Sequence, residues 1–490
     1  MTKFPTPSLD WAALSPELIL LGGAAVCLLV PLFLPHGWRR HFCAFVSILA
    51  FLGAGAAAIA LFQMDETGTA IVADAIRRDR LAELAQVLIA GSGLLTVGVS
   101  YAYVLRERMG EYYSLLLTAA AGMCFFVAAN DLMTMFLGLE WFSISLYILC
   151  AIAIEEVASL EAGLKYLIVG SFGSAILLFG SAFVYGATGV IGFEDIAAAS
   201  GDANQLFLVT GLAMIIVGLG FKVSAAPFHM WTPDVYQGAP TPVTAFMSAA
   251  TKIAALVLTM RLFVTAFPNE ENLWTISLAV IVCISLAWGN LGALVQTDVK
   301  RMLAYSSISH AGFLLMPIAV GTPLGGRALM YYLISYAAMS IGSFAVVAAR
   351  ERELAQPVTL EGMSGMGWER PGLGAAMTLF MFGFIGLPPA GLFIGKFYAF
   401  SAAVDRGWAW LAVVGAIATV VSIYYYLGVV RAMYFQPAIR VAPAGGSPPR
   451  ELALGTSVLL AVVVTIGTFI GAQPLLDIAT DAVSFLPFPH

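Results

Sequence analysis

Long apolar runs separated by short polar stretches are the dominant pattern of this chain. A helix that crosses a bilayer needs about 20 mostly apolar residues, and fourteen runs reach or approach that length. The pattern therefore predicts an all-α polytopic membrane protein with about 14 transmembrane helices. The predicted helices cover residues 16–34, 42–62, 82–104, 112–129, 132–153, 160–185, 206–226, 243–266, 274–296, 301–319, 327–349, 373–403, 408–430 and 452–471.

Prolines interrupt the pattern at the seventh and the twelfth predicted helix. The first interruption lies in Phe221–Thr244 and the second in Gly383–Lys396. Proline removes a backbone donor and breaks a helix, and such a break survives at membrane depth only where protein or a water-filled cavity satisfies the backbone. Corresponding breaks in two halves of a chain indicate a transport site. The prolines are Pro227, Pro233, Pro240 and Pro242 in the first segment, and Pro388 and Pro389 in the second.

The two halves of the chain show weak internal similarity. The segment that starts at Asp131 aligns with the one that starts at Asp298, and LKYLI at Leu164 aligns with MYYLI at Met330. The similar offsets predict two five-helix repeats, the second inverted because five is odd; the alternative is chance similarity between leucine-rich helices. The expected organisation is three N-terminal helices (1–110), a first repeat (111–267), an inverted second repeat (268–435), and a C-terminal helix with its tail (436–490).

Composition supports a membrane location. The chain is 60% hydrophobic and 11% charged, with a mean hydropathy of +0.91, whereas soluble domains carry about 25% charged residues. No C-x-x-C or G-x-G-x-x-G motif occurs, so no iron–sulfur, disulfide or nucleotide-binding site is indicated. No targeting segment is recognisable, which favours a bacterial cytoplasmic (inner) membrane, although an organelle-encoded chain would look similar.

The distribution of Lys and Arg predicts the orientation. With the N-terminus outside, twelve Lys and Arg residues fall on the inner side and seven on the outer side. Because inner loops are enriched in these residues, both termini are expected on the outer, periplasmic side.

Lysines stand inside or at the edge of the apolar runs, where this residue is rare. Each charged side chain at the bilayer centre costs roughly 2.5–3.5 kcal/mol on insertion scales, so such residues indicate function. Burial and a nearby carboxylate affect a lysine's charge in opposite directions, which allows it to gain and lose a proton. The pattern predicts a proton or cation path. The lysines are Lys165, Lys222, Lys252, Lys300 and Lys396.

Glu140 and Lys222 are candidates for a functional pair. Glu140 is the only carboxylate in the middle of a predicted span, and Lys222 lies five residues before Pro227. On neighbouring helices the two charges would stabilise each other; the alternative is a static ion pair that fixes helix packing. Lys252 lies about ten residues into the eighth helix, and Lys396 follows the second break. Both are expected on the path.

Four further residues have more than one interpretation. His310 titrates near neutrality and suits a relay beside nearby serines, or is a core histidine. Lys165 near the start of the sixth helix either acts in transport or extends to the surface. Lys300 beside Arg301 is most simply an anchor on the inner side. His229 in the broken segment either caps free backbone groups or faces the path.

Four segments identify a family. They read EAGLKYLIVGSFGSA, GLGFKVSAAPFHMWTPDVYQGAPTPVTAF, DVKRMLAYSSISHAGF and GLPPAGLFIGKF. They resemble the antiporter-like membrane subunits of respiratory complex I, whose relatives are the large subunits of multi-subunit cation/proton antiporters and of membrane-bound hydrogenases. The resemblance covers about residues 110–435. The opening SPELIL and the later SIYYYLGVVRAMYF look most like the N type of the bacterial complex I subunits.

The resemblance implies roles for the candidate residues. Glu140 and Lys222 match the family's pair on helices five and seven, Lys252 the central lysine of helix eight, and Lys396 the helix-twelve lysine near the outer exit. His310 would bridge the two half-channels. Lys165, His229 and Lys300 also match family positions. The M type has a glutamate where Lys396 stands, which argues for the N or L type.

The resemblance also implies a function and a setting. The chain would translocate protons as part of NADH–quinone oxidoreductase, without redox catalysis or a cofactor of its own, while FMN, iron–sulfur clusters, NADH and quinone belong to other subunits. Implied partners are the neighbouring M chain, the small K-type chain, the lateral helix of the L chain and the bilayer, and no nucleic acid. The alternatives are a cation/proton antiporter or hydrogenase subunit, and a scaffold in which the lysines only organise packing.

Overall fold

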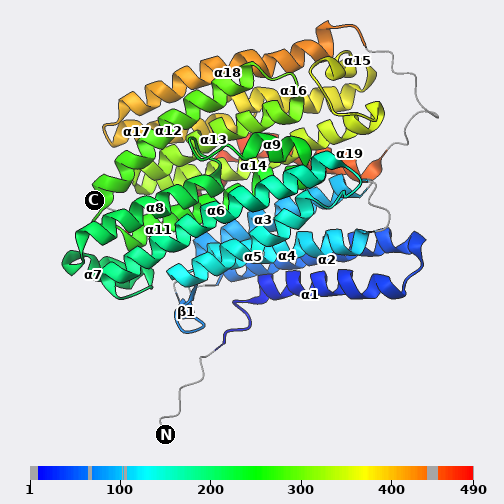
Figure 1. Ribbon diagram of the computed structural model, residues 1–490. Coiled ribbons are helices and arrows are strands. Elements are labelled where there is room, and N and C mark those ends of the chain that lie inside the picture. Colours follow the sequence, from blue (N-terminus) through cyan, green and yellow to red (C-terminus); the bar gives the residue numbers. More distant parts are fainter. Residues whose placement is uncertain (1–8, 65–68, 102, 104–107, 439–450, 489–490) are drawn as a thin grey trace.

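Nearly all of the chain folds into one set of long helices that lie side by side (Figure 1). A computed structural model describes residues 9–64, 69–101, 103, 108–438 and 451–488. Within these residues, 13 helices are long and apolar enough to cross a membrane. The prediction of an all-α polytopic membrane protein is therefore confirmed.

The N-terminal part contributes three of these helices and a small hairpin. They are α1 (Ser15–Leu29, extended by a 3-10 turn over Val30–Phe33), α2 (His36–Phe62) and α3 (Arg80–Ser100). Between α2 and α3, strands β1 (Thr69–Ile71) and β2 (Ile76–Arg78) pair antiparallel, with Thr69 opposite Arg78. The hairpin marks one end of the bundle, called the hairpin end below; α15 (Met366–Glu369) lies at the other, called the α15 end (Figure 1).

Two sets of five membrane-crossing segments follow. The first comprises α4 (Met109–Val127), α5 (Leu132–Cys150), α6 (Val157–Thr188), the pair α8 (Gln205–Val223) and α9 (Thr232–Gly238), and α10 (Thr241–Phe246) continuing through a π-turn (Met247–Thr251) into α11 (Lys252–Ala266). The second comprises α12 (Glu271–Leu294), α13 (Val299–Val320), α14 (Pro323–Leu354), the pair α16 (Pro371–Ile385) and α17 (Leu392–Asp405), and α18 (Ala409–Phe435).

Shorter elements complete the chain. The connections hold α7 (Phe193–Ala199) and 3-10 turns at Ser200–Asp202 and Glu361–Met363, and the C-terminal part forms α19 (Leu452–Ile470) and α20 (Ala472–Val483). Each of the fourteen predicted segments contains a helix. The hydropathy pattern does not predict α20, whose length of 12 residues is too short for a span. It packs its buried face, with Leu476 and Ala479, at the hairpin end.

Both predicted breaks are present, and their backbones match. Ser224 ends α8 and Gly386 ends α16, each with a positive φ. The amide of Ala225 donates to Gly220 O at 2.8 Å, and that of Leu387 donates to Phe382 O at 3.0 Å. These hydrogen bonds satisfy carbonyls that would otherwise be free at a helix end. The same pattern thus recurs 162 residues later.

The helix starts show the repeat as well. The side chain of Asp131 accepts from the amide of Thr134 and begins α5, and that of Asp298 accepts from Arg301 N and begins α13. Asp131 forms a backbone bridge with Gly192, and Asp298 forms one with Thr359. Both correspondences have an offset of 167 residues. Asp131 lies at the hairpin end and Asp298 at the α15 end, so the second repeat is inverted.

The most deeply buried spans lie in the middle of the bundle. Almost every residue of Thr241–Ala266, Val299–Val320 and Pro323–Leu354 is buried. The peripheral helices α1, α2, α18 and α19 instead turn large apolar side chains outward, such as Phe33 and Val420. Outward apolar faces suit contact with lipid chains. The candidate lysine Lys252 and His310 therefore belong to the protein interior.

Helices α6 and α8 cross so closely that only glycine fits at the crossing. A Cβ on Gly211 would lie 2.7 Å from Gly180 O. We expect Gly211→Ala to lower stability by about 1–3 kcal/mol, the usual cost of overpacking, and to reduce the amount of folded chain in membranes. The matched control is Gly186→Ala on α6, where the nearest atom, Phe207 Cδ2, is 3.8 Å away. Equal losses in both variants would show that helix contact is not the cause.

Candidate functional site

Lys222 lies in the last turn of α8, directly before the first break. Its side chain is 3% exposed. The ammonium donates to Ser143 Oγ at 2.6 Å and to the Tyr166 hydroxyl at 3.4 Å, and it lies 4.4 Å from the centre of the Phe142 ring. A helix C-terminus and an aromatic face both stabilise a cation. The site can therefore hold a charged lysine without a carboxylate in contact.

Glu140 approaches this lysine but does not touch it. It is half-buried on α5, one helical turn before Ser143. Among the described residues, no ion pair within 4.0 Å joins Glu140 to Lys222, and Glu140 Oε1 has no hydrogen-bond partner. The two groups nevertheless interact electrostatically. On α5, Glu140 shares a stripe with the outward-facing Leu137 and Ile144, while its Oε1 is buried.

Lys252 lies where the π-turn meets α11. It is 1% exposed and donates to Val223 O, the carbonyl that follows Lys222, at 2.8 Å. The π-turn shifts the register of the helix by one residue, a feature often found at functional sites. The last turn of α8 thus carries Lys222, and its final carbonyl accepts from Lys252.

Lys396 repeats this arrangement in the second half. It donates to Phe384 O at 2.9 Å and to Ile385 O at 3.0 Å, the last carbonyls of α16. Ile385 corresponds to Val223 at the repeat offset of 162. The ammonium also lies 4.3 Å from the centre of the Phe313 ring. Each broken helix therefore presents its C-terminal carbonyls to a buried lysine.

His310 lies on α13 and is 2% exposed. Its Nδ1 is 2.8 Å from the Tyr332 hydroxyl and its Nε2 is 3.1 Å from that of Tyr426. Its ring packs against Phe384, the residue whose carbonyl binds Lys396. Both Lys252 and Lys396 lie within electrostatic range of the imidazole. Both lysines therefore act on His310 from a distance, and its role as a bridge between the two half-channels stays a prediction.

Hydroxyl groups connect the neighbourhood of Lys252 to that of His310. Ser248 in the π-turn accepts from Ser340 at 2.7 Å. Tyr336, one turn before Ser340 on α14, is hydrogen-bonded to Ser307 at 3.1 Å and packs against the His310 ring. Three serines near His310 have side-chain partners: Ser306 is bonded to Tyr426, Ser307 is bonded to Tyr336, and Ser309 accepts from Asn290.

Lys165 lies away from this path, near the α15 end. Its side chain is 42% exposed, and its ammonium is 2.7 Å from Glu161 and 2.8 Å from Asp234. Asp234, on α9, also pairs with Arg301 of α13 at 2.6 Å. The sequence analysis left surface extension and transport open for Lys165. The observed position combines partial exposure with an ion-pair network that joins the two repeats.

Lys300, for which anchoring on the inner side is the simplest interpretation of the sequence, is buried near the start of α13. It is 5% exposed and donates to Ala239 O at 2.8 Å and to Thr241 Oγ at 3.0 Å. Glu351 of α14 lies 3.7 Å away and is bonded to Thr241. The ammonium thus binds the backbone between α9 and α10, where a donor is needed because Pro240 and Pro242 interrupt the helix.

His229 is in the first break but faces away from the lysines. It is 8% exposed, its ring packs against Trp288 of α12, and its Nδ1 has no hydrogen-bond partner. Its neighbour Met230 is 67% exposed. His229 therefore lies near the outer surface of the bundle, and the structure does not bring it into contact with Lys222 or Lys252.

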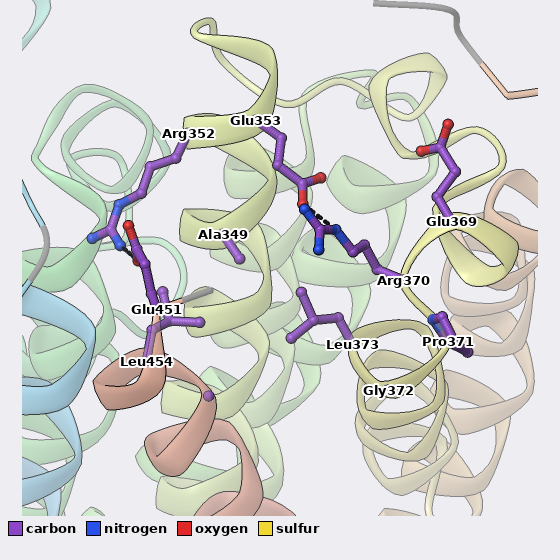
Figure 2. A pocket seen from close by; sticks show the side chains of 11 residues that line it. Ala349, Arg352, Glu353, Glu369, Arg370, Pro371, Gly372, Leu373, Glu451 and Leu454 are labelled. Carbon is purple, nitrogen blue, oxygen red and sulfur yellow. Dashed lines mark hydrogen bonds and ion pairs between the residues drawn. The ribbon is translucent and has the colours of Figure 1, made fainter. Parts of the chain in front are cut away.

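Two cavities open near the α15 end. One of about 680 Å³ lies between α4, α5 and α6 and reaches Tyr147, whose ring packs edge-on against Tyr166 beside Lys222. The other, of about 490 Å³, lies between α14, α16 and α19. Figure 2 shows that Arg352 faces Glu451 and Arg370 faces Glu353 there. The first cavity leads towards the predicted site; the second contains none of the predicted site residues.

Several residues that contact Lys165, Lys222 or His310 were not predicted. Ser143, Tyr166, Tyr336 and Tyr426 are compatible with an apolar helix and carry no distinct signal in the sequence. Asp234 did carry one, since it is a carboxylate within the broken segment. A carboxylate near a helix break is therefore a sequence signal for an ion pair, as is a carboxylate within a span.

Comparisons with known proteins identify relatives across the whole chain. Residues 129–422 match the family model described as "NADH:quinone oxidoreductase/Mrp antiporter, TM". The chain is 42% identical to NADH-quinone oxidoreductase subunit N of Trichlorobacter lovleyi over 86% of its own length and 87% of that protein. It is 37% identical to the subunit N of Chloroflexus aggregans over 100% of its own length and 97% of that protein.

Solved structures give the same result. A chain of respiratory complex I from Thermus thermophilus is 32% identical, with a TM-score of 0.79 over 95% of this chain and 99% of that one. A chain of an archaeal membrane-bound sulfane sulfur reductase is 25% identical, with a TM-score of 0.87 over 98% of both chains. A chain of the Mrp complex from Dietzia sp. is 21% identical, with a TM-score of 0.86 over 97% of both chains, and shows the shared fold alone.

Proposed function

The chain belongs to the NADH:quinone oxidoreductase/Mrp antiporter transmembrane family, and from this premise we propose that its buried lysines carry protons across the membrane. It is a proton-translocating membrane subunit of NADH-quinone oxidoreductase, related over its full length to subunit N. One observation supports the route above all others. Each broken helix ends on carbonyls that bind a buried lysine, Val223 O with Lys252 and Ile385 O with Lys396.

The proposed route starts at Lys222 and ends at Lys396. An ionised carboxylate nearby favours a charged lysine, and burial favours a neutral one. A change in the position or charge of Glu140 therefore alters the proton affinity of Lys222. The charge on Lys222 in turn acts on Lys252 across the end of α8, and a proton passes through the hydroxyl groups and His310 to Lys396.

The energy needed is modest. Moving one charge against 100 mV costs about 2.3 kcal/mol, and a shift of one pKa unit in a proton carrier corresponds to about 1.36 kcal/mol. Shifts of a few pKa units are therefore sufficient.

The cavity between α4, α5 and α6 is the proposed route to Lys222, since it reaches Tyr147. Lys165 and Lys300 are assigned to coupling between the repeats. Asp234 of the first repeat pairs with Lys165 and with Arg301 of the second repeat. Glu351 of the second repeat lies near Lys300 and is bonded to Thr241 of the first repeat. His229 is assigned no proton transfer.

Membership of the complex suggests the orientation of the chain in the membrane and its neighbouring subunits. We place residues 1–110 outside the transport unit, 111–267 and 268–435 in the two repeats, and 436–490 in the C-terminal part. The α15 end faces the cytoplasm and the hairpin end the periplasm of a bacterial inner membrane. NADH, FMN, iron–sulfur clusters and quinone are handled by other subunits, and M-, K- and L-type chains are the proposed neighbours. The outward stripe of α5 at Glu140 suits contact with such a neighbour.

A cation/proton antiporter or hydrogenase subunit is the second candidate function. The Mrp and sulfane sulfur reductase chains share the fold, but full-length relatives at 37–42% identity favour the NADH-linked complex. A native gel of mild-detergent membranes with a tagged chain tests this point. Co-migration with an NADH-oxidising band supports the proposal, and separation from that band would favour an antiporter.

Replacing the residues at the start of the route should impair pumping while the complex still assembles. We expect Lys222→Met to abolish NADH-driven proton uptake by inverted vesicles. Glu140→Gln should reduce it about tenfold, since charges a few ångströms apart interact by on the order of 1–3 kcal/mol. The rate of electron transfer from NADH to an artificial acceptor should stay unchanged, because that reaction takes place in other subunits.

The control for these variants is Glu155→Gln, which removes an exposed carboxylate in the loop between α5 and α6. Normal pumping by either Lys222→Met or Glu140→Gln, at normal levels of assembled complex, would contradict the proposed control of Lys222 by Glu140. Loss of assembly without a specific effect on pumping would favour the scaffold interpretation.

A further inference from the structure

A small cavity lies at the hairpin end, outside the lysine route. Its volume is about 10 Å³, which is roughly the space needed to hold one water molecule. Polar side chains line it from three elements: Glu17 of α1, Arg77 and Arg78 of β2, and Glu83 and Gln86 of α3. Leu61, Ile71, Ile76 and other apolar residues close the remaining sides.

Three buried oxygens of this cavity have no hydrogen-bond partner. They are Glu17 Oε2, Glu83 Oε2 and Gln86 Oε1. The three residues are only 6%, 2% and 5% exposed, respectively. A buried acceptor without a donor costs about 1–3 kcal/mol, and more if it is charged. Arg77 Nε is the one unpartnered donor among the described cavity residues, so three such acceptors around one water-sized space indicate an occupant that supplies further donors.

The other atoms of these groups are paired, which fixes their orientation. Gln86 Nε2 donates to Glu17 Oε1 at 2.8 Å, and Arg78 Nε donates to Glu83 Oε1 at 3.3 Å. The amide nitrogen of Gln86 therefore faces the carboxyl group of Glu17, and its oxygen faces the cavity without a partner.

Among the residues that the structure describes, one negative charge at the cavity, that of Glu17, has no cation in contact. Arg78 pairs with Glu83, Arg77 pairs with Glu194, and Asp79 pairs with Arg261. Arg80 packs its guanidinium over the Phe62 ring and does not line the cavity. Within the described part of the chain, the side-chain partner of Glu17 is the neutral amide of Gln86. An ionised carboxylate in such a site is costly unless a positive charge joins it.

We propose that this cavity is a proton-binding site, in which Glu17 is protonated and one water molecule completes the hydrogen bonds. Glu17 Oε2–H donates to the water oxygen, and the two water hydrogens donate to Glu83 Oε2 and Gln86 Oε1. The proton comes from the aqueous phase at the hairpin end, and its uptake cancels the negative charge of Glu17. All three free acceptors are then satisfied. The site is independent of the route from Lys222 to Lys396.

Infrared difference spectra of the assembled complex between acidic and alkaline buffer test this proposal. We expect Glu17→Gln, which keeps the shape of the side chain, to lose one carboxylic acid C=O band. Gln86→Met should keep that band and shift it to higher frequency, because the carbonyl loses the hydrogen bond from Gln86 Nε2. Glu155→Gln, at an exposed loop position, should leave the band unchanged.

Two results would overturn the proposal. One is a spectrum of Glu17→Gln that matches the wild type in the carboxylic acid region. The other is binding of about one radioactive sodium ion per complex that is lost in Glu17→Gln, since sodium would satisfy the same three oxygens while Glu17 stays ionised. If Glu17→Gln does not assemble, Gln86→Met decides, because an unshifted band in that variant would exclude Glu17 as its source.

Discussion

Replacing Lys252 with methionine should abolish proton transfer through this chain and leave the bundle folded. Lys252 is 1% exposed, and its only hydrogen-bond partner among the described residues is Val223 O. Methionine has a similar length and no charge, so the substitution removes a buried cation and the cost of holding it. A positioned proton-transfer group typically contributes about 10²–10⁴-fold. We therefore expect proton uptake per NADH oxidised by inverted vesicles to fall at least about 10²-fold.

Arginine at the same position separates a proton carrier from a structural cation. Arginine keeps the positive charge but does not release its proton under physiological conditions. If Lys252 carries protons, Lys252→Arg should fail as Lys252→Met does; if its charge only organises packing, arginine should restore pumping. The control is Arg431→Met, which removes an exposed positive charge at the end of α18. Pumping by Lys252→Met at the wild-type rate would exclude this residue from the route.

The lysines could be found from the sequence because a charge within an apolar run is costly and rare. The breaks could be found for a similar reason, since Pro227 and Pro389 interrupt otherwise continuous runs. The repeat was recognisable from a few polar positions, such as Asp131 and Asp298, whose side chains begin corresponding helices. In each case the residue type is rare inside a helix or specific to a helix end, so it is recognisable from the sequence alone.

The partners of these lysines could not be predicted in the same way. Lys252 and Lys396 bind backbone carbonyls, and every residue has a carbonyl, so the sequence carries no signal for this contact. The tyrosines around His310 resemble ordinary core aromatics until the packing of α13, α14 and α18 brings their hydroxyl groups together. The π-turn before Lys252 likewise depends on tertiary packing, since its residues are compatible with a regular α-helix.

The burial of charged residues near helix ends is hard to predict from the sequence. Lys300 beside Arg301 has the sequence pattern of an exposed anchor, yet the fold buries its ammonium against Ala239 O. Arg261 was counted among the outer-side charges that set the orientation, yet it is 2% exposed. Counting charges at helix ends does not separate residues that face water from residues that turn inward, because both lie at the same depth along the helix.

Breaking the buried pair between Asp79 and Arg261 should cause the largest loss of stability in the molecule. Asp79 is fully buried at the start of α3, and its two oxygens accept from the guanidinium of Arg261 on α11, with Nη2 at 2.7 Å from Oδ1. Removing one member of a buried pair leaves the other charge uncompensated and costs about 3–5 kcal/mol. We expect Asp79→Asn and Arg261→Met each to lower the thermal midpoint of the assembled complex and its level in membranes.

The choice of substitutions isolates the ion pair from helix capping. Asp79 also accepts from Ala82 N and so begins α3, and asparagine is an equally good residue at this position. The control is Glu194→Gln, which breaks the exposed pair with Arg77 and should cost only about 0–1 kcal/mol. The double variant Asp79→Asn/Arg261→Met leaves no unpaired charge, so it should lose less stability than the two single variants added together. Simple additivity would show that the two charges do not depend on each other, and that α3 and α11 are joined by apolar packing alone.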